Sequence, residues 1–251
     1  MRIMVCGRNL DDLYPLLDEF PVEIDEKSPE LIVSYGGDGT LLGAERDYPG
    51  IPKCPIRDSR SAKKCERHGE RAILADLLAG RLQTTELGKV QGRVSDRELR
   101  AVGINDVVID HKTKASAIRY RLWINDMLYA RHIVGDGIVL STPFGSSGYY
   151  RSITHSLFTL GLGLAFNNST EVVNHLVVES NVRVEIEILR GPAVMFADND
   201  PEQIELVEGD RAGLSLASER ARVLGLDVFR CPDCYWLRHH HERPLVPLSG
   251  I

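Results

Sequence analysis

The chain has 251 residues, of which 43% are hydrophobic and 26% charged, a balance typical of a globular protein with a core of useful size. Acidic residues outnumber basic ones by 36 to 30, and the net charge of -6 argues against a general nucleic-acid binder. The sequence shows neither a signal-peptide pattern nor an apolar run of about 18 residues that could span a membrane. We therefore expect a cytoplasmic protein with no nucleic-acid and no membrane partner.

The first part of the chain alternates between strand-like and helix-like patterns. Apolar runs predict short strands at residues 2–7, 22–25, 31–34 and 51–56. Helices are predicted after Asn9 or Asp11, over 40–46 and over 69–82, where leucine and isoleucine recur at helical spacing. This alternation predicts an α/β domain over residues 1–90, with helices packed on a parallel sheet.

From about residue 85 the sequence becomes rich in β-strand patterns separated by turn signals. Strands are predicted at residues 102–110, 118–124, 127–134, 137–140, 176–178, 182–189, 193–197, 203–207 and 213–216. The stretch VRVEIEIL at 182–189 alternates cleanly and predicts a half-buried strand. We expect a β-rich, sandwich-like domain over residues 91–222. The tail, 223–251, has too little apolar periodicity to fold alone and is expected to pack back on the first domain.

The stretch SYGGDGT, residues 34–40, places three glycines around one aspartate directly after an apolar run. Asp-Gly is a strong hairpin signal, but the following TLLGAER does not alternate as a strand would. It looks like the start of a helix. A strand, a glycine loop and a helix N-terminus together present backbone N–H groups to an anion, so we prefer a phosphate loop to a plain turn. Its residues are Gly36, Gly37, Asp38, Gly39 and Thr40.

Two further stretches suggest a nucleotide site. Residues 135–150, GDGIVLSTPFGSSGYY, combine hydroxyls, glycines and two tyrosines whose rings could stack on a flat polar ligand. The alternative is a serine-rich surface loop. Asn105 and Asp106 stand beside a strand-like run, and an amide with a carboxylate can hold a ribose diol. Taken alone, that pair is more typical of a capped strand start.

Together these motifs resemble the NAD kinase family in order and spacing, over about residues 30–220. The matching segments are GGDGT at 36–40, the Asn-Asp pair at 105–106, Asp-Gly at 136–137 and the TPxGSxxY block at 142–149. The glycine loop alone would also fit diacylglycerol kinase, sphingosine kinase or phosphofructokinase relatives. The TPxGSxxY block separates the NAD kinase family from them.

The resemblance implies an N-terminal α/β domain, a β-rich C-terminal domain and an active site between them. It implies a kinase that transfers the γ-phosphoryl of ATP, or of another donor such as polyphosphate, to the 2′-hydroxyl of the adenosine ribose of NAD, with Mg²⁺ on the phosphates. Asp38 would be the catalytic base, and Gly36, Gly37, Gly39 and Thr40 would form the phosphate loop. The NAD-binding residues would be Asn105, Asp106, Asp136, Ser147, Gly148, Tyr149 and Ser152. Members of the family assemble as homodimers or homotetramers.

The sequence departs from the family pattern in several places, most clearly in residues 51–69. Where the family has a loop rich in glycine with an asparagine, residues 51–69 carry Arg57, Arg60, Lys63 and Lys64. This basic loop could bind an extra phosphate, or it could be a solvated surface loop. Its divergence leaves two alternatives open, namely a related phosphotransferase with another nucleotide, a sugar or a lipid as acceptor, and a non-catalytic adenylate-binding sensor.

Five cysteines are too few, and odd in number, for a disulfide framework. The pair Cys231 and Cys234 has the spacing of half a zinc site. Cys54 and Cys65 could complete four thiolates if the tail packs on the first domain. The alternative is a set of unpaired thiols followed by an exposed histidine run at 239–241.

Overall fold

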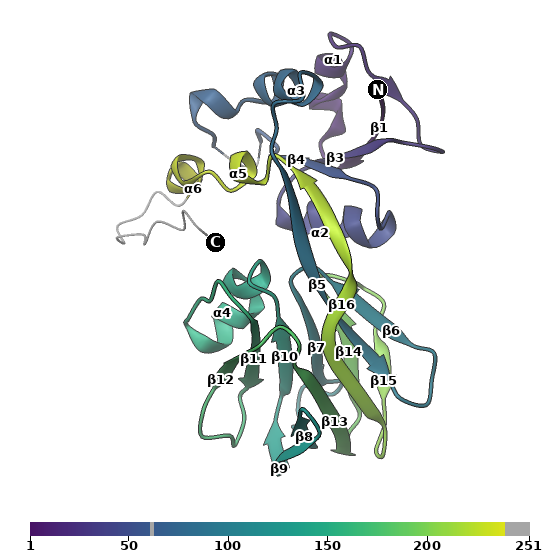
Figure 1. Cartoon of the computed structure of the whole chain (residues 1–251), viewed down its shortest axis with the longest axis vertical. Coiled ribbons are helices and arrows are strands. Elements are labelled where there is room, and N and C mark those ends of the chain that lie inside the picture. Colours follow the sequence, from purple (N-terminus) through teal and green to yellow (C-terminus); the bar gives the residue numbers. More distant parts are fainter. Residues whose placement is uncertain (61–62, 239–251) are drawn as a thin grey trace. The chain divides into compact units, whose positions relative to one another are not determined.

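The computed structural model describes residues 1–60 and 63–238. Within this part the chain forms two compact units, the first made of residues 1–87 with 220–238 and the second of residues 88–219 (Figure 1). No described helix combines the length and apolar character needed to cross a membrane. The histidine run and the rest of the tail after residue 238 lie outside the described residues.

The first unit is built on a parallel sheet in the order β2-β1-β3-β4, as the alternating sequence patterns predicted. Its strands are β1 (Arg2–Gly7), β2 (Glu23–Ile24), β3 (Leu31–Tyr35) and β4 (Lys53–Ile56). Its helices are η1 (Leu10–Asp12), α1 (Tyr14–Leu17), α2 (Asp38–Asp47), η2 (Glu66–His68), α3 (Glu70–Leu78), α5 (Leu226–Phe229) and α6 (Pro232–Arg238).

Helix α3 shows how the sequence pattern sets both the packing and the length of an element. Its apolar face buries Ile73, Leu74 and Leu77 in the core of the first unit, together with residues of β1, β3 and β4. The predicted helix extended to residue 82, but α3 ends at Leu78. The cause is Gly80, whose φ of +65° is the left-handed conformation that commonly terminates helices.

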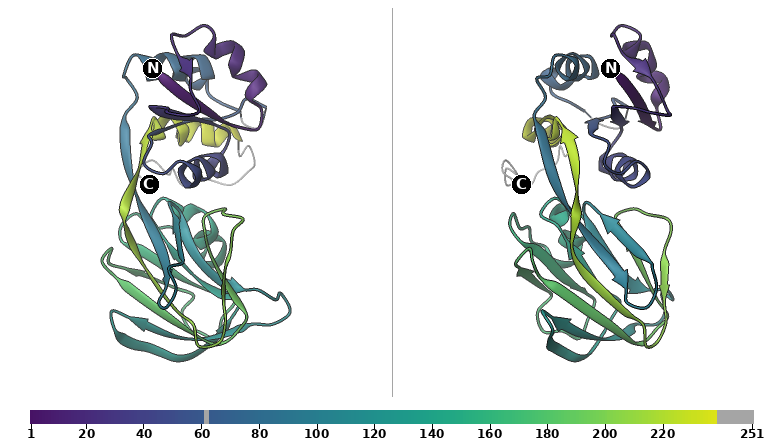
Figure 2. Two further views of the ribbon diagram at one scale, coloured as in Figure 1. Left: turned by 90° about the vertical axis from the view of Figure 1, so that its right-hand side faces the viewer. Right: turned by 45° about the vertical axis from the view of Figure 1, so that its right-hand side comes forward.

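The second unit consists of two antiparallel sheets whose inner faces share one core, which confirms the expected β-rich, sandwich-like architecture (Figure 2). One sheet contains β5 (Thr84–Val94), β6 (Arg100–Gly103), β8 (Ile118–Ile124), β9 (Met127–Gly135), β13 (Arg183–Arg190) and β16 (Arg211–Leu224). The other contains β7 (Asp106–His111), β10 (Gly137–Ser141), β11 (Leu162–Asn167), β12 (His175–Val178), β14 (Ala193–Ala197) and β15 (Ile204–Leu206). The remaining helices are η3 (Gly145–Ser147) and α4 (Tyr149–Thr154).

The alternation of β13 appears in the structure as predicted, whereas β5 was not recognised from its sequence. In β13 every second residue, Val184, Ile186 and Ile188, is buried. Strand β5 reads TTELGKVQGRV and lacks such a pattern. A Cβ on its Gly92 would lie 2.5 Å from the sulfur of Met195, so this glycine serves close packing that only the tertiary structure reveals.

Candidate functional site

The glycine loop connects a buried strand to a helix, the arrangement that the sequence predicted. Strand β3 is buried along its whole length, and α2 begins at Asp38, so the loop is Gly36 and Gly37. A Cβ on Gly36 would lie 2.3 Å from Oγ1 of Thr40, so a side chain cannot be placed there without moving Thr40. The N–H groups of Thr40 and Leu41 close the first turn on the carbonyl of Gly37, at 3.0 and 3.3 Å. Gly39 lies in this first turn, where a helix N-terminus favours an anionic ligand.

Two arginines approach the carboxylate of Asp38. Nη2 of Arg57, in the loop after β4, lies 3.3 Å from Oδ2, and Nη2 of Arg230, between α5 and α6, lies 3.9 Å from Oδ1. Arg57 is held in place because its Nε donates to the carbonyl of Phe229 at 3.2 Å and its guanidinium stacks on the aromatic ring of Phe229. The Asp38 side chain remains 47% exposed. The site therefore combines an accessible proton acceptor with guanidinium groups that can bind phosphate.

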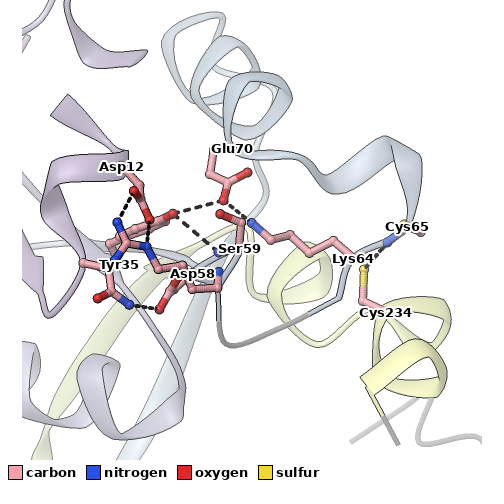
Figure 3. A network of polar contacts seen from close by, with 10 residues as sticks. Asp12, Tyr35, Asp58, Ser59, Lys64, Cys65, Glu70 and Cys234 are labelled. Carbon is pink, nitrogen blue, oxygen red and sulfur yellow. Dashed lines mark hydrogen bonds and ion pairs between the residues drawn. The ribbon is translucent and has the colours of Figure 1, made fainter. Parts of the chain in front are cut away.

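Two other cations of the basic loop, Arg60 and Lys64, pair within the first unit (Figure 3). Arg60 binds the carboxylate of Asp12 through Nε at 2.6 Å and Nη2 at 2.5 Å. Lys64 forms an ion pair with Glu70. These partners already neutralise both side chains, which leaves Arg57 as the cation of this segment that is directed at Asp38.

In the second unit the Asn105 segment and the TPFGSS segment are joined by hydrogen bonds. The N–H of Thr142 donates to the carbonyl of Asn105 at 2.8 Å, and its hydroxyl donates to the carbonyl of Ile104 at 2.6 Å. The same hydroxyl accepts from the N–H of Gly145 at 3.0 Å. A Cβ on Gly145 would lie 2.2 Å from the carbonyl oxygen of Asn105, so the close approach requires glycine. The two motifs therefore form one rigid group.

Asp198 fixes the backbone of the Asn105 segment from the other side. Its carboxylate accepts the N–H groups of Ile104, Asn105 and Asp106 at 2.9, 2.7 and 3.2 Å. Oδ1 of Asn105 is buried, and no described residue donates to it. A Cβ on Gly148 would lie 3.8 Å from Nδ2 of the same side chain. A buried acceptor without a partner inside a fixed backbone is what a binding site for a hydroxyl or amino group requires.

Asp106 and Asp198 are two buried carboxyl groups in one cluster. Burial, followed by the charge of Asp198, raises the pKa of Asp106 to about 7. Burial also raises the pKa of Asp198, to about 6, although three backbone hydrogen bonds oppose the shift. Because those N–H groups stabilise the charged form, Asp198 is the carboxylate of the pair and Asp106 is the group that takes up a proton first.

Asp106→Asn is expected to flatten the pH dependence of stability. With its raised pKa, folded Asp106 holds a proton more tightly than the unfolded chain does, so its contribution is present below about pH 4 and is lost as the pH rises through about 7. That contribution is on the order of 4 kcal/mol at most. Asparagine does not titrate. Urea unfolding between about pH 4 and about pH 8 should therefore show the free energy of unfolding of the variant rising relative to that of the wild type as the pH increases. Parallel pH curves for the two proteins would contradict the assignment.

Asp136 lies at the far end of β10 from Thr142. Because a strand rises about 3.3 Å per residue, the two are separated by a strand of roughly 17 Å. Oδ2 of Asp136 accepts from Nδ2 of Asn168 at 3.0 Å, and Oδ1 lies 3.3 Å from Nδ1 of His111. The hydroxyl of Tyr149 accepts from Nδ2 of Asn167 at 3.0 Å. Burial raises the pKa of Tyr149, and the charges of Asp110, Asp136 and Asp106 raise it further.

The remaining residues of the TPxGSxxY block differ in their accessibility. Ser147 is partly buried in η3, and Gly148 is exposed just before α4. Ser152 is exposed and its hydroxyl donates to the carbonyl of Tyr149 at 2.7 Å. Both tyrosines were expected to stack on a ligand, but Tyr150 cannot do so. It is fully buried against Phe158, with ring centroids 4.9 Å apart. Tyr149 alone keeps a partly exposed ring.

The structure groups three of the four predicted metal-ligand candidates and places the fourth elsewhere. Cys65, Cys231 and Cys234 come together as predicted, but His68 takes the fourth place. Cys54 lies in β4 inside the core of the first unit, where burial raises the pKa of its thiol to about 12. It packs as a small apolar side chain. The spacing of Cys65 and His68, with two residues between them, was the signal in the sequence that could have identified the pair.

Sequence reasoning also left Arg230 unassigned. It lies in a tail without clear periodicity, and 191 residues lie between Asp38 and Arg230, so no local pattern relates it to the glycine loop. Its position near Asp38 follows from the described part of the tail folding with the first unit.

Comparisons with known proteins agree with these local features. No protein-family model matches the chain. The chain is 26% identical over 219 residues to a Clostridium perfringens protein named NAD kinase, covering 81% of this chain and 77% of that protein. It is 28% identical over 218 residues to a Methylibium petroleiphilum NAD kinase, covering 79% and 70%.

A solved structure shares the fold. The crystal structure of an NAD kinase from Archaeoglobus fulgidus in complex with ATP aligns with a TM-score of 0.72 at 18% identity, covering 96% of this chain and all of that one. The chain thus aligns with these NAD kinases over about four-fifths of its length and has the fold of the solved one. On these grounds the chain is similar to NAD kinases in sequence and shares the fold of a solved NAD kinase.

Proposed function

We propose that the protein is an NAD kinase that transfers the γ-phosphoryl group of ATP to the 2′-hydroxyl of the adenosine ribose of NAD and so makes NADP. The observation that carries the proposal is the exposed carboxylate of Asp38 at the start of α2, beside the guanidinium groups of Arg57 and Arg230. An adenylate sensor without catalytic activity would have less need of that carboxylate.

In the proposed reaction the 2′-hydroxyl oxygen attacks the γ-phosphorus of ATP, the bond to the bridging oxygen breaks, and ADP leaves with the electron pair. Asp38 accepts the proton of the hydroxyl. The N-terminus of α2 and the backbone of Gly36 and Gly37 face the phosphates, and the two arginines stabilise the charge on the transferred group. Such a reaction depends mainly on positioning and on electrostatic stabilisation.

Mg²⁺ is the expected companion of the nucleotide. The phosphates would supply most of the ligands of the ion, because the carboxylate of Asp38 is flanked by two arginines and acts as the proton acceptor. When bound, the ion neutralises part of the phosphate charge.

For the second unit we propose the role of binding NAD. Asn105, whose Oδ1 lacks a described donor, and Asp106, whose raised pKa lets it donate as a neutral acid, would bind the adenosine hydroxyls. Ser147, Gly148 and Tyr149 would surround the adenine, and Ser152 would border it. Asp136 would contact the nicotinamide side of the molecule, since it lies a strand length away.

The basic loop was the main reason to consider another acceptor. Arg60 and Lys64 are bound by Asp12 and Glu70, so neither is left as a dedicated site for an extra phosphate. This pairing accounts for two of the four cations that suggested an extra phosphate on the acceptor. We also propose that the protein forms a homodimer or homotetramer, which its mass in solution by light scattering would test.

The test is direct. Purified protein is incubated with Mg²⁺, ATP and NAD, and NADP is measured with an NADP-specific dehydrogenase, with polyphosphate replacing ATP and NADH replacing NAD in parallel reactions. We expect NADP and ADP in equal amounts. If no NADP forms with either donor while calorimetry shows that NAD binds, the proposal is wrong, and other acceptors or a sensor role take its place.

A further inference from the structure

Four potential metal ligands from two distant segments meet in the first unit. Cys65 directly precedes η2 and His68 ends it, in the connection between β4 and α3. Cys231 directly precedes α6, and Cys234 lies in its first turn. Each pair has two residues between its members, the spacing with which short turns present ligands to zinc.

The distances between the ligand atoms match the edges of a tetrahedron around a zinc ion. The four atoms all lie within 4.8 Å of one another. Sγ of Cys65 and Sγ of Cys234 are 3.5 Å apart, and Nδ1 of His68 lies 3.3 and 3.4 Å from them. Zn–S bonds of about 2.3 Å and Zn–N bonds of about 2.0 Å at tetrahedral angles give S···S edges of about 3.8 Å and S···N edges of about 3.5 Å.

The surroundings are those of a closed structural site. Cys231 and Cys234 are 5% and 2% exposed. The backbone N–H of Cys65 donates to Sγ of Cys234 at 3.3 Å, a contact that supports a metal-bound thiolate (Figure 3). Three sulfur ligands and one imidazole are a set that selects zinc over magnesium or calcium.

We propose that Cys65, His68, Cys231 and Cys234 bind one structural zinc ion. Four protein ligands fill the tetrahedral coordination and leave no open position for substrate, so this ion takes no part in the phosphoryl transfer. A disulfide between Cys65 and Cys234 would instead require their sulfurs to approach from 3.5 Å to about 2.05 Å. It would also leave His68 and Cys231 without the partner that places them there.

The zinc ion would hold the two segments that carry the arginines of the candidate site. Arg230 directly precedes Cys231, and the loop of Arg57 leads to Cys65. Arg57 bonds to the backbone of Phe229, two residues before Cys231. The metal therefore acts on Asp38 only through the position of these arginines, so its loss should disturb the phosphate site while leaving the second unit intact.

The first experiment measures metal in untagged protein by inductively coupled plasma mass spectrometry. The protein carries His239→Ala, His240→Ala and His241→Ala so that the histidine run cannot bind zinc adventitiously. We expect one zinc per chain. Cys234→Ser should reduce the zinc content to near zero and lower the thermal unfolding midpoint. The matched control, Cys6→Ala, removes a thiol outside the cluster and should keep the full zinc content.

A second measurement does not depend on the variant folding. Protein stripped of metal and loaded with Co²⁺ should show the absorption bands of tetrahedral cobalt with thiolate ligands, and zinc should displace them. Chelator treatment should also expose three cysteines to alkylation that zinc protects. Protein that contains no zinc, gives no such cobalt spectrum and carries a Cys65–Cys234 disulfide or freely reactive thiols would overturn the proposal.

Discussion

Replacing Asp38 by asparagine is expected to lower the rate of NADP formation by roughly 100- to 10,000-fold, the range typical of a lost general base. Asparagine keeps the shape of the side chain and its place in the first turn of α2, but it cannot take the proton of the 2′-hydroxyl. The loss should fall on kcat, and NAD should still bind, because its proposed binding residues lie in the second unit. Steady-state kinetics with calorimetry on the same protein measures both quantities.

A matched control separates the role of Asp38 from a general charge effect. Asp47 ends the same helix, is 53% exposed and pairs with Arg46. Asp47→Asn should therefore retain wild-type kinetics. Arg57→Gln provides the second comparison, because it removes the cation beside Asp38 and should mainly raise KM for ATP. If Asp38→Asn keeps full turnover, another group removes the proton and the proposed mechanism is wrong.

The sequence predicted those parts of the fold that local patterns determine. The run at 31–34 followed by glycines and TLLGAER indicated a strand, a loop and a helix, and the structure has β3, Gly36-Gly37 and α2 in these places. The alternation at 182–189 predicted β13 and its buried face. In both cases the residues that determine the element are neighbours in the chain, so periodicity and turn chemistry were sufficient.

The parts that were missed depend on contacts between distant residues. His68 joins the cysteine cluster because it lies 3.4 Å from Cys234, 166 residues further on. Tyr150 could be assigned to the core only once Phe158 and β11 were placed against it. Whether the basic loop binds phosphate or is a surface loop stayed open because the sequence does not show that Arg60 meets Asp12. Composition alone cannot distinguish a paired cation from a free one.

The ion pair between Glu45 of α2 and Lys53 of β4 leads to the second large effect. Their side chains are 3% and 0% exposed, and Nζ of Lys53 also donates to the carbonyl of Tyr48 at 2.5 Å. Lys53→Met should destabilise the first unit by about 3–5 kcal/mol, because it leaves the Glu45 carboxylate buried without its ion-pair partner. Denaturant unfolding measures this change. NADP formation reports whether α2, whose first residue is Asp38, keeps its position.

The double variant Glu45→Leu with Lys53→Met should recover much of that loss, because replacing both members of a buried ion pair by apolar groups is often nearly neutral. Lys112→Met is the exposed counterpart, since Lys112 and Glu205 lie 2.7 Å apart at the surface with side chains 47% and 53% exposed. It should cost less than about 1 kcal/mol. If Lys53→Met were as mild as Lys112→Met, the carboxylate of Glu45 would have to reach water or take up a proton in the variant. In that case the Glu45–Lys53 pair would not be what fixes α2, and with it Asp38, against β4.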